Sequence, residues 1–393
     1  MILVINTGSS SIKMSLLERS SMQLLAEGLT QRLGEGVAVL SWNIGEETIN
    51  QNLTEANHQS AMAEMLDILF THINKTSIVA VGHRVVHGGE KFVAPTLLDE
   101  EVIADIQALS HLAPLHNPSN LLGVQAAMAR LSDVSHIAVF DTAFHQTMPQ
   151  KASLYAVPYA WYEQFGVRRY GFHGTSHHYV AEETARMLGR GVQDISILVA
   201  HLGNGCSASA IAKGISVDTT MGLTPLEGLV MGTRSGDVDP GLIDFMSRQT
   251  GSSLKELTGV LNKESGLLGL SGLSNDMRSL ILASEDGDMQ ATLAIEVFCY
   301  RLAKALLGLT ACLEQLDAIV FTGGIGEHAA VVRSKTLAQL KLLGVQLDEQ
   351  ANHKHGVLNK GLISSSDSNV AVMVVPTNEE KMIAEYVCEV LES

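Results

Sequence analysis

The chain has 393 residues, of which 46% are hydrophobic and 17% are charged, a composition typical of a compact globular protein rather than a disordered or fibrous one. A chain of this length exceeds the usual size of one hydrophobic core, so we expect two domains or one duplicated domain. The formal net charge of -16 argues against nonspecific binding to nucleic acid or anionic membranes, because both require a cationic surface.

The four cysteines are scattered and none forms a CxxC pair, which argues against a zinc site or a disulfide framework and favours a reducing compartment. The chain opens directly on an apolar run, without the basic segment and cleavage site of a secretory signal, and no later stretch has the length of a membrane span. We therefore expect a cytoplasmic protein.

One pattern occurs twice, half a chain apart. Residues 2–5 form a short apolar run rich in β-branched side chains, a polar turn follows, and an extended pattern resumes at 12–17. Residues 197–211 repeat this order, and Ile2 aligns with Ile197 at an offset of 195 residues. Apolar runs that end in glycine and serine also arise by chance, but the half-length offset favours a duplicated domain.

Further apolar runs predict buried strands, and amphipathic stretches between them predict helices. The alternation indicates an α/β fold with mixed sheets. No low-complexity linker separates the two halves, so we place the domain boundary only within a range, between Phe144 and Ala156. The helix-like stretch 379–391 could return to pack on the first domain. The predicted strands are 78–81, 137–140, 318–321 and 370–375, and the predicted helices are 61–71, 178–188 and 289–313.

Three segments combine glycines with small hydroxyl residues at the end of a predicted strand: NTGSSSIK (6–13), HLGNGCS (201–207) and FTGGIGEH (321–328). Such loops let backbone N–H groups approach phosphate oxygens closely. None matches the P-loop, and none is a clean dinucleotide-binding fingerprint. One such loop is usually an ordinary turn, but three, one of them carrying Lys13, favour a nucleotide held between two domains.

Two arginines stand in or beside glycine-rich segments. Arg84 follows an apolar run in VGHRVVHGGE, and Arg234 lies in MGTRSGDVDPG. A guanidinium grips a carboxylate or phosphate with two parallel hydrogen bonds. The alternative for each is a local ion pair, with Glu90 or Asp237 as the partner.

Aspartate and histidine mark two further segments. Asp141 ends an apolar run in FDTAFH, a common position for a metal or phosphate site and also for a simple turn. His173 lies between two glycines in GFHGTSHH, where we interpret His177 and His178 as residues at a helix start. No HExxH motif or neighbouring cysteine supports a zinc site.

The segment PTNEE places Glu379 and Glu380 at the start of a predicted helix, where acidic side chains favour the helix dipole. Capping accounts for one of the two. The other could reach magnesium through water.

These motifs together resemble the acetokinase family, the acetate kinases and their propionate kinase relatives, within the superfamily of sugar kinases, heat-shock ATPases and actin. The resemblance runs through nearly the whole chain, in ILVINTGSSSIK, GHRVVHGGE, VFDTAFHQTMP, RRYGFHGTSH, HLGNGCS, TPLEGLVMGTRSGDVDPG, FTGGIGEH and PTNEE. It implies two ribonuclease H-like domains, 1–148 with 380–393 and 149–379, with ATP in the cleft between them. It also implies a homodimer.

The resemblance also implies roles for individual residues. Asn6 and Glu379 would hold Mg²⁺, with Mn²⁺ possible in its place, and Lys13 would contact phosphate. Arg84 would anchor the carboxylate, Asp141 would be the active-site acid, and His173 and Arg234 would stabilise the transition state. The implied apolar pocket for the substrate's methyl group is Val86, Leu115, Phe172 and Pro225. The implied nucleotide contacts are His201, Leu202, Gly203, Asn204, Gly205, Asp276, Met277, Arg278, Gly324, Ile325, Gly326, Glu327 and His328.

The chemistry makes these roles reasonable. A carboxylate is already ionised at neutral pH, so its attack on the γ-phosphorus of ATP needs no base. Its difficulty is the repulsion between two anions, which cations and preorganised donors relieve. We therefore interpret Asp141 as positioning magnesium, its waters or an arginine, with general-base catalysis as the weaker alternative. A valine at 86 rather than an alanine narrows the pocket and favours acetate over propionate.

Two other functions fit the sequence less well. A sugar kinase would need a base and polar groups around its substrate, and the apolar pocket argues against it. An actin-like or chaperone-like switch ATPase would need a surface for a protein partner, and the chain has no added domain to provide one.

Overall fold

The computed structural model describes residues 1–392 and divides into two compact units. The first comprises Met1–Gln146 and the C-terminal segment from Asn378, and the second comprises Thr147–Thr377. Both boundaries lie two residues before those inferred from the sequence. As a result Glu379, which our boundaries assigned to the second domain, belongs to the first unit. Within residues 1–392, no helix is both long and apolar enough to cross a membrane.

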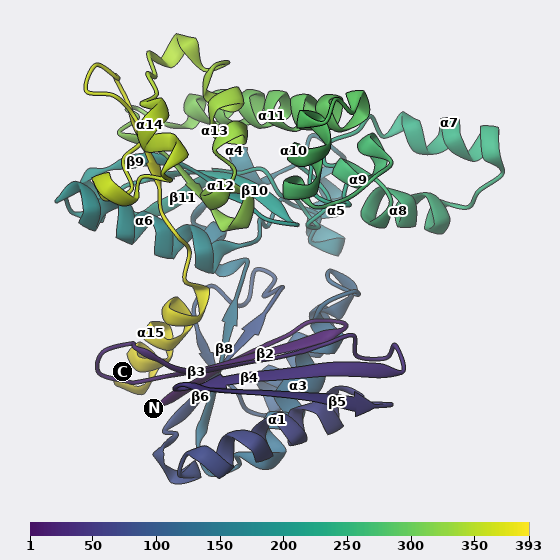
Figure 1. The fold of residues 1–393 in the computed structure, drawn as a ribbon. Coiled ribbons are helices and arrows are strands. Elements are labelled where there is room, and N and C mark those ends of the chain that lie inside the picture. The colour runs from purple at the N-terminus through teal and green to yellow at the C-terminus, as the bar shows by residue number, and fades with distance from the viewer. Residues whose placement is uncertain (393) are drawn as a thin grey trace. The chain divides into compact units, whose positions relative to one another are not determined.

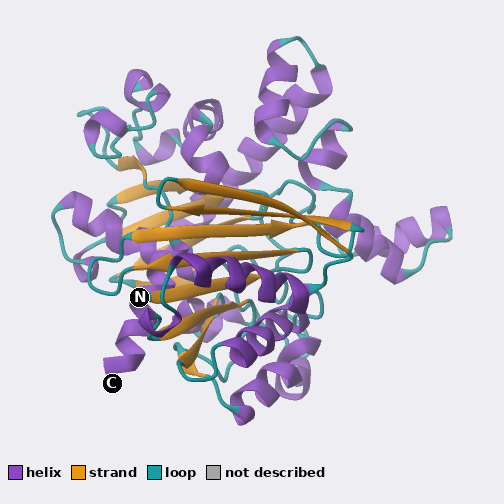
Figure 2. Ribbon diagram, turned by 60° about the horizontal axis from the view of Figure 1, so that its bottom comes forward, coloured by secondary structure: helices purple, strands orange, loops and turns teal. Residues whose placement is uncertain are grey.

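The first unit contains an eight-stranded mixed sheet in the order β5-β4-β3-β2-β1-β6-β8-β7. Strands β1 to β5 form an antiparallel meander, whereas β6 and β8 continue the sheet parallel to β1. Figure 2 shows the long neighbouring strands as one layer bordered by helices. The strands are β1 Ile2–Thr7, β2 Ser11–Leu17, β3 Leu24–Gln31, β4 Val37–Ile44, β5 Glu47–Thr54, β6 Ala80–Val85, β7 Thr96–Leu97 and β8 Ser135–Phe140.

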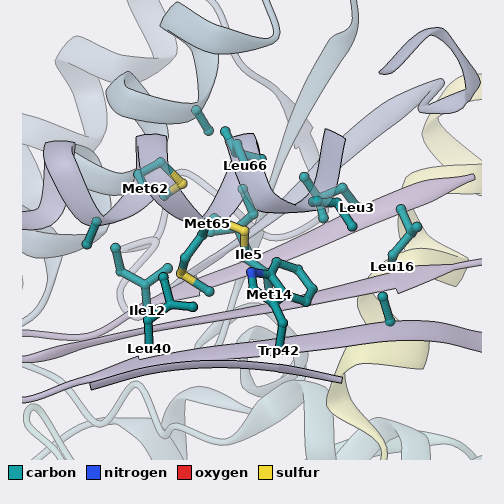
Figure 3. Close-up of a cluster of buried hydrophobic side chains, with 14 of the residues drawn as sticks. Leu3, Ile5, Ile12, Met14, Leu16, Leu40, Trp42, Met62, Met65 and Leu66 are labelled. Atoms are coloured by element: carbon teal, nitrogen blue, oxygen red, sulfur yellow. The ribbon is translucent and has the colours of Figure 1, made fainter. Parts of the chain in front are cut away.

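Helices cover both faces of this sheet (Figure 1). On one face α1 inserts Met62, Met65 and Leu66 among apolar side chains of β1, β2 and β4, including Trp42 (Figure 3). On the other face α15, formed by the far end of the chain, packs Ile383 and Val387 on β1 and β6. The helices are α1 His58–His72, α2 Glu100–Ala108, α3 Asn117–Arg130 and α15 Glu379–Glu392.

The second unit contains a five-stranded sheet in the order β11-β10-β9-β12-β13. The long helix α11 packs on one face and α6 on the other (Figure 1). The strands are β9 Ser196–Leu202, β10 Cys206–Ala212, β11 Ile215–Thr219, β12 Ala318–Thr322 and β13 Ala371–Val374. The helices are α4 Gln150–Ser153, α5 Tyr159–Phe165, α6 Gly174–Leu188, α7 Gly241–Thr250, α8 Leu254–Lys263, α9 Gly266–Ser271, α10 Met277–Glu285, α11 Met289–Leu309, α12 Gly323–His328, α13 Ala330–Leu337 and α14 Glu349–His353.

The two sheets share one topology, as the sequence repeat predicts. In each, a hairpin and a third antiparallel strand are followed by two parallel strands: β3-β2-β1-β6-β8 and β11-β10-β9-β12-β13. The registers also correspond, because Ile2 pairs with Ala80 as Ile197 pairs with Ala318. The α/β fold with duplicated ribonuclease H-like domains and mixed sheets is therefore confirmed.

Several predicted elements differ in their limits. The helices predicted over 61–71 and 178–188, for example, begin earlier, at His58 and Gly174. The run 78–81 predicts a strand that in fact extends from Ala80 to Val85, because its end carries polar side chains that interrupt the apolar pattern. The helix predicted over 289–313 ends at Leu309 and continues as one turn of 3₁₀ helix. The segment FTGGIGEH is not an open loop, because residues 323–328 form the short helix α12.

A pair of histidines is buried between β6 and β8. His83 Nε2 lies 2.8 Å from His136 Nδ1, and His136 Nε2 lies 3.0 Å from the Leu131 carbonyl oxygen. The carbonyl can only accept, so His136 carries its proton on Nε2 and accepts from His83 on Nδ1. Burial lowers the pKa of both histidines, that of His83 strongly. Both rings are therefore neutral in the fold.

We expect this pair to make the protein less stable in mild acid. The unfolded chain binds protons on these histidines below about pH 6.5 while the folded chain does not, so unfolding becomes easier as the pH falls. The free energy of unfolding from urea titrations at about pH 7.5 and about pH 5.5 measures this loss. Each neutral imidazole contributes a slope of up to roughly 1.4 kcal/mol per pH unit. The His83→Gln variant should show a shallower slope, and an unchanged slope would contradict the assignment.

Candidate active site

The first unit collects polar side chains at one end of a sheet face. Asn6 on β1 is the register partner of Lys13 on β2 and of Arg84 on β6. Asp141 directly follows β8, and its N–H donates to the Val85 carbonyl at 3.0 Å. Alternation along the strands puts these residues on the face whose other positions are apolar and lie under α15. The carboxyl ends of β1, β6 and β8 thus carry the polar cluster.

Helix α15 brings the acids of its first turn to this cluster. Asn378 caps the helix, because its Oδ1 accepts from the Lys381 N–H at 2.9 Å, so neither glutamate is needed as the cap. The close approach requires a glycine on β6, since a Cβ atom at Gly82 would lie 2.6 Å from Ile383 Cγ2. Glu379 and Glu380 are thereby placed beside the strand-end cations.

Arg84 is the centre of the cluster. Its Nε and Nη2 donate to the two oxygens of Asp141 at 2.8 and 2.6 Å, and its Nη1 donates to Asn6 Oδ1 at 3.3 Å. Glu379 Oε2 lies 3.8 Å from Arg84 Nε. Burial alone would lower the pKa of Arg84, but Asp141 and Glu379 outweigh it and raise that pKa. Arg84 is therefore a permanent cation paired with Asp141, and not with Glu90.

Lys13 forms a second ion pair in the same region. Its Nζ lies 2.6 Å from Glu380 Oε1 and 2.9 Å from Glu27 Oε1, and these contacts raise the Lys13 pKa against the opposing effect of burial. Glu379 behaves differently, since burial and the neighbouring carboxylates raise its pKa to about 7 although Arg84 acts against them. The neighbouring cations therefore neutralise the Glu379 carboxylate only in part.

The cluster offers too few donors to hold a magnesium ion by itself, so waters and phosphate oxygens would have to complete the coordination shell. Within residues 1–392, no group of three or more His, Cys, Asp or Glu side chains is placed to hold a metal ion. However, Mg²⁺ commonly takes one or two carboxylates and completes its shell with waters and phosphate oxygens. The amide oxygen of Asn6 and the underneutralised carboxylate of Glu379 both face Arg84 and are donors of this kind.

Two buried asparagines of α3 fix the strand ends, and sequence reasoning missed them. Asn120 Nδ2 donates to the Thr7 carbonyl at 2.6 Å, and its Oδ1 accepts from the Val86 N–H at 3.0 Å. Asn117 bonds both the N–H and the carbonyl of His87, at 3.1 and 3.0 Å. Asn120 thus joins the last residue of β1 to the loop after β6, and Asn117 fixes that loop further along. The signal available was the pair of asparagines three residues apart in HNPSN.

The second unit holds His173 and Arg234 around the loop after β9. A Cβ atom at Gly205 would lie 3.4 Å from the His173 ring and 3.5 Å from Arg234 Nη1, so both side chains border this glycine. The rings of His173 and His201 lie 4.5 Å apart, centroid to centroid. Glycine at 205 leaves room for the histidine and the arginine together.

Arg234 is a largely buried cation without an acidic partner. Its Nη1 donates to the Pro225 carbonyl at 3.2 Å, and no carboxylate within residues 1–392 forms an ion pair with it. Asp237, the partner that the sequence suggested, accepts from the Gly228 N–H instead. Burial lowers the Arg234 pKa. A buried guanidinium that lacks a carboxylate favours the approach of an anion.

A pocket of about 870 Å³ opens beside this loop, within the size range of small-molecule sites. The loop after β9 and the start of α10 are joined here, because Asn275 Nδ2 donates to Asn204 Oδ1 at 2.9 Å. Of the expected nucleotide contacts, those that line it are Gly203, Asn204, Asp276, Met277, Arg278, Gly324, Ile325 and His328. Asn275, Ile281, Leu282, Glu285 and Ala329 line it as well and were not foreseen.

The other expected nucleotide contacts do not line this pocket: His201, Leu202, Gly205, Gly326 and Glu327. Glu327 Oε1 accepts from the N–H groups of Gly323 and Thr377, at 2.9 and 3.2 Å. The Gly326 carbonyl accepts from Arg333 at 2.7 Å. Gly326 and Glu327 therefore hold α12 in place.

The four residues expected to form the apolar pocket are divided between the units. Val86 and Leu115 belong to the first, where Val86 is buried and Leu115 is 58% exposed. Phe172 and Pro225 belong to the second, where Phe172 precedes His173 and the Pro225 carbonyl is bound by Arg234. Val86 lies two residues after Arg84 in the sequence, and Pro225 contacts Arg234 through its carbonyl.

Comparisons with known proteins cover nearly the whole chain. The model of the acetokinase family matches residues 1–385. An acetate kinase of Deinococcus radiodurans is 52% identical over 382 residues, which are 97% of this chain and 96% of the relative. Among solved structures, a propionate kinase from Francisella tularensis is similar with a TM-score of 0.94 at 42% identity, covering 98% of both chains. An acetate kinase from Porphyromonas gingivalis gives 0.91 at 40%, covering 99% of both.

Proposed function

The chain belongs to the acetokinase family, and from this membership we infer that it is an acetate kinase, which transfers the γ-phosphate of ATP reversibly to the carboxylate of acetate, giving acetyl phosphate and ADP. The observation that carries this function is about 52% identity to curated acetate kinases over nearly the full length. The more remote alternative, a switch ATPase, has no support from the family match.

In the first unit we assign Arg84 to the acetate carboxylate. Three of its five N–H groups donate to Asn6 and Asp141, and the remaining two can bind an incoming carboxylate. Asp141 keeps the guanidinium oriented and is not needed as a base, because acetate is already ionised at neutral pH. Lys13 is assigned to the phosphate chain, although phosphate oxygens must then compete with Glu27 and Glu380.

In the second unit we assign His173 and Arg234 to the transferring phosphoryl group. Charge spreads over its three equatorial oxygens in the transition state, where preorganised donors and cations act most strongly. The unpaired charge of Arg234 and the adjacent imidazole of His173 supply a cation and a hydrogen-bond donor. The pocket between α10 and α12 takes the nucleoside, and its apolar wall from Ile281 and Leu282 suits a base.

We assign Asn6 and Glu379 as the protein ligands of Mg²⁺, or of Mn²⁺ in its place. When bound, the ion neutralises part of the charge on the phosphates of ATP. A homodimer is proposed as well, in line with the exposed apolar side chains Met289, Leu293 and Tyr300 on one face of α11. A cytoplasmic location is proposed from the scattered cysteines and the family resemblance.

The function is tested by trapping the acyl phosphate with hydroxylamine after incubation with Mg-ATP and matched concentrations of acetate, propionate and butyrate. Acetate should give the most product. Propionate ahead of acetate would support the alternative, a propionate kinase with the same mechanism, for which the similar Francisella structure is the specific observation. No product from any acid would exclude a carboxylate kinase.

We expect Val86 to determine how strongly the enzyme prefers acetate over the larger propionate. Replacing Val86 with alanine removes two methyl groups beside the Arg84 strand, and one methylene of pocket space is worth about 1–3 kcal/mol of discrimination. The KM for propionate should therefore fall roughly tenfold or more relative to the KM for acetate. Steady-state kinetics with both acids measure this ratio. Val93→Ala is the matched control, because Val93 is 59% exposed in the same unit and should leave the ratio unchanged. Equal effects on both acids would remove Val86 from the specificity.

A further inference from the structure

His173 is held by more than its own helix. It stands at the N-cap of α6 with a φ of 58°, in the left-handed region that costs energy for any residue other than glycine. Its Nδ1 lies 2.9 Å from Ser207 Oγ on β10. A strained backbone with a fixed ring nitrogen indicates that the direction of the imidazole is constrained.

The hydroxyl of Ser207 is shared with a second imidazole. His177, one helical turn after His173, places its Nε2 2.8 Å from the same Ser207 Oγ. The other nitrogen of His177, Nδ1, lies 2.7 Å from Ser209 Oγ. Ser207 and Ser209 are two residues apart on β10 and therefore face the same side. His177, Ser207 and Ser209 are all completely buried.

This chain of hydrogen bonds restricts where the protons lie. A hydroxyl has one hydrogen, so Ser207 can donate to only one of the two imidazoles and must accept from the other. If His177 is neutral, the direction of every hydrogen bond from Ser209 to His173 is set by the direction of any one of them, which leaves two possible proton orders. In one order Ser209 donates to His177 Nδ1, His177 Nε2–H donates to Ser207, and Ser207 donates to His173 Nδ1. In the reverse order His173 Nδ1 carries the proton, and Ser209 accepts from His177 Nδ1–H. The hydroxyl hydrogen of the completely buried Ser209 then has no acceptor in the described chain, which disfavours the reverse order.

The two orders have opposite consequences for an anion. If His173 Nδ1 accepts from Ser207, the ring proton of neutral His173 is on Nε2, which can donate to a phosphoryl oxygen. If Nδ1 is protonated instead, neutral His173 presents a lone pair on Nε2 that repels the oxygen. A cationic ring would also donate, but complete burial of His177, Ser207 and Ser209 makes additional charge costly next to His173.

We propose that Ser207, His177 and Ser209 are positioning residues that fix neutral His173 as the Nε2–H tautomer, so that it donates a hydrogen bond to the transferring phosphoryl group. This inference rests on the proposed function for the role of His173. The tautomer itself is a property of the resting protein. His201 is oriented by separate hydrogen bonds, because Ser176 Oγ lies 2.7 Å from both His201 Nδ1 and Thr377 Oγ1.

Ser209→Ala tests the relay from its far end, because Ser209 lies two hydrogen bonds beyond the residue that contacts His173. The variant should lower kcat by about tenfold and leave the KM values for acetate and ATP unchanged, since it weakens a contact made in the transition state. Ser209→Thr retains the hydroxyl and should restore kcat. Ser153→Ala is the control, because Ser153 is equally buried in the same unit and its hydroxyl has no hydrogen-bond partner in the described chain.

The tautomer is measured directly by NMR of the full-length protein labelled with ¹⁵N-histidine, with the His173 signal assigned through His173→Asn. In the wild type, Nδ1 of His173 should be unprotonated and Nε2 protonated, and in Ser209→Ala both tautomers should appear. If Ser209→Ala fails to fold, Ser209→Cys, with a weaker donor of similar size, replaces it. A protonated Nδ1 in the wild type, or one tautomer in both proteins, would overturn the proposal. The expected tautomers in a protein that forms no acetyl phosphate would retain the relay and reject the proposed function.

Discussion

Replacing Arg84 with alanine should remove most of the kinase activity and also destabilise the first unit. The side chain is assigned to acetate, so its loss should lower kcat/KM for acetate by roughly 10²–10³-fold, as is typical for a preorganised charged donor. Asp141, whose side chain is 2% exposed, would be left as a buried unpaired carboxylate. Breaking such a pair costs about 3–5 kcal/mol of folding free energy. Acetyl phosphate formation and urea unfolding measure the two effects.

The double variant Arg84→Ala with Asp141→Ala separates the two contributions. Removing both partners leaves no unpaired aspartate, so the double variant should regain much of the stability that Arg84→Ala loses. The part it does not regain comes from Glu379, which loses the neighbouring cation Arg84 in both variants. Activity should stay low, because the group that binds acetate is still absent. A double variant as unstable as the single one would show that the ion pair with Asp141 is not what Arg84 contributes to the fold.

Replacing Arg234 with alanine should reduce activity to a similar extent without a loss of stability. Arg234 is assigned to the phosphoryl group, and its removal should lower kcat by roughly 10²–10³-fold. No carboxylate is left unpaired, because Arg234 has no acidic partner within residues 1–392, and burial already lowers its pKa. The free energy of unfolding should therefore stay unchanged or increase, which urea titration measures beside kcat.

Arg234→Lys is the matched control for charge. It keeps the positive charge but loses the planar fork that binds two oxygens, so it should recover only part of kcat. If Arg234→Ala were as destabilised as Arg84→Ala, the arginine would be a structural residue and its assignment to phosphate would fail. The contrast between the two arginines is thus a test of which one the fold needs.

The sequence predicted the fold well because its signals were local and repeated. The apolar runs at Ile2 and Ile197 mark the same first strand of each sheet, and the glycine segments follow them directly. Arg84 and Asp141 end apolar runs, and the carboxyl ends of parallel strands meet at one edge. The proximity of Arg84 and Asp141, the part of the candidate site at the strand ends, could therefore be inferred without a structure.

Contacts between distant segments could not be inferred in the same way. Glu379 joins the first unit because Gly82 lets α15 pack closely on β6, a condition set 297 residues earlier in the chain. From the sequence, Ser207 and Ser209 are ordinary strand residues. Their role depends on α6, which places His177 in hydrogen-bonding distance of both. Asn120 likewise reaches the end of β1 and the loop after β6 only through the packing of α3.

The central claim is that a carboxylate oxygen of acetate attacks the γ-phosphorus of ATP. The most direct measurement uses acetate labelled with ¹⁸O in both oxygens, unlabelled Mg-ATP and ³¹P NMR of the acetyl phosphate formed. We predict that one ¹⁸O is bonded to phosphorus and shifts the ³¹P signal, because the attacking oxygen becomes the bridge as ADP leaves. An acetyl phosphate signal without the isotope shift, or no acetyl phosphate at all, would contradict the account.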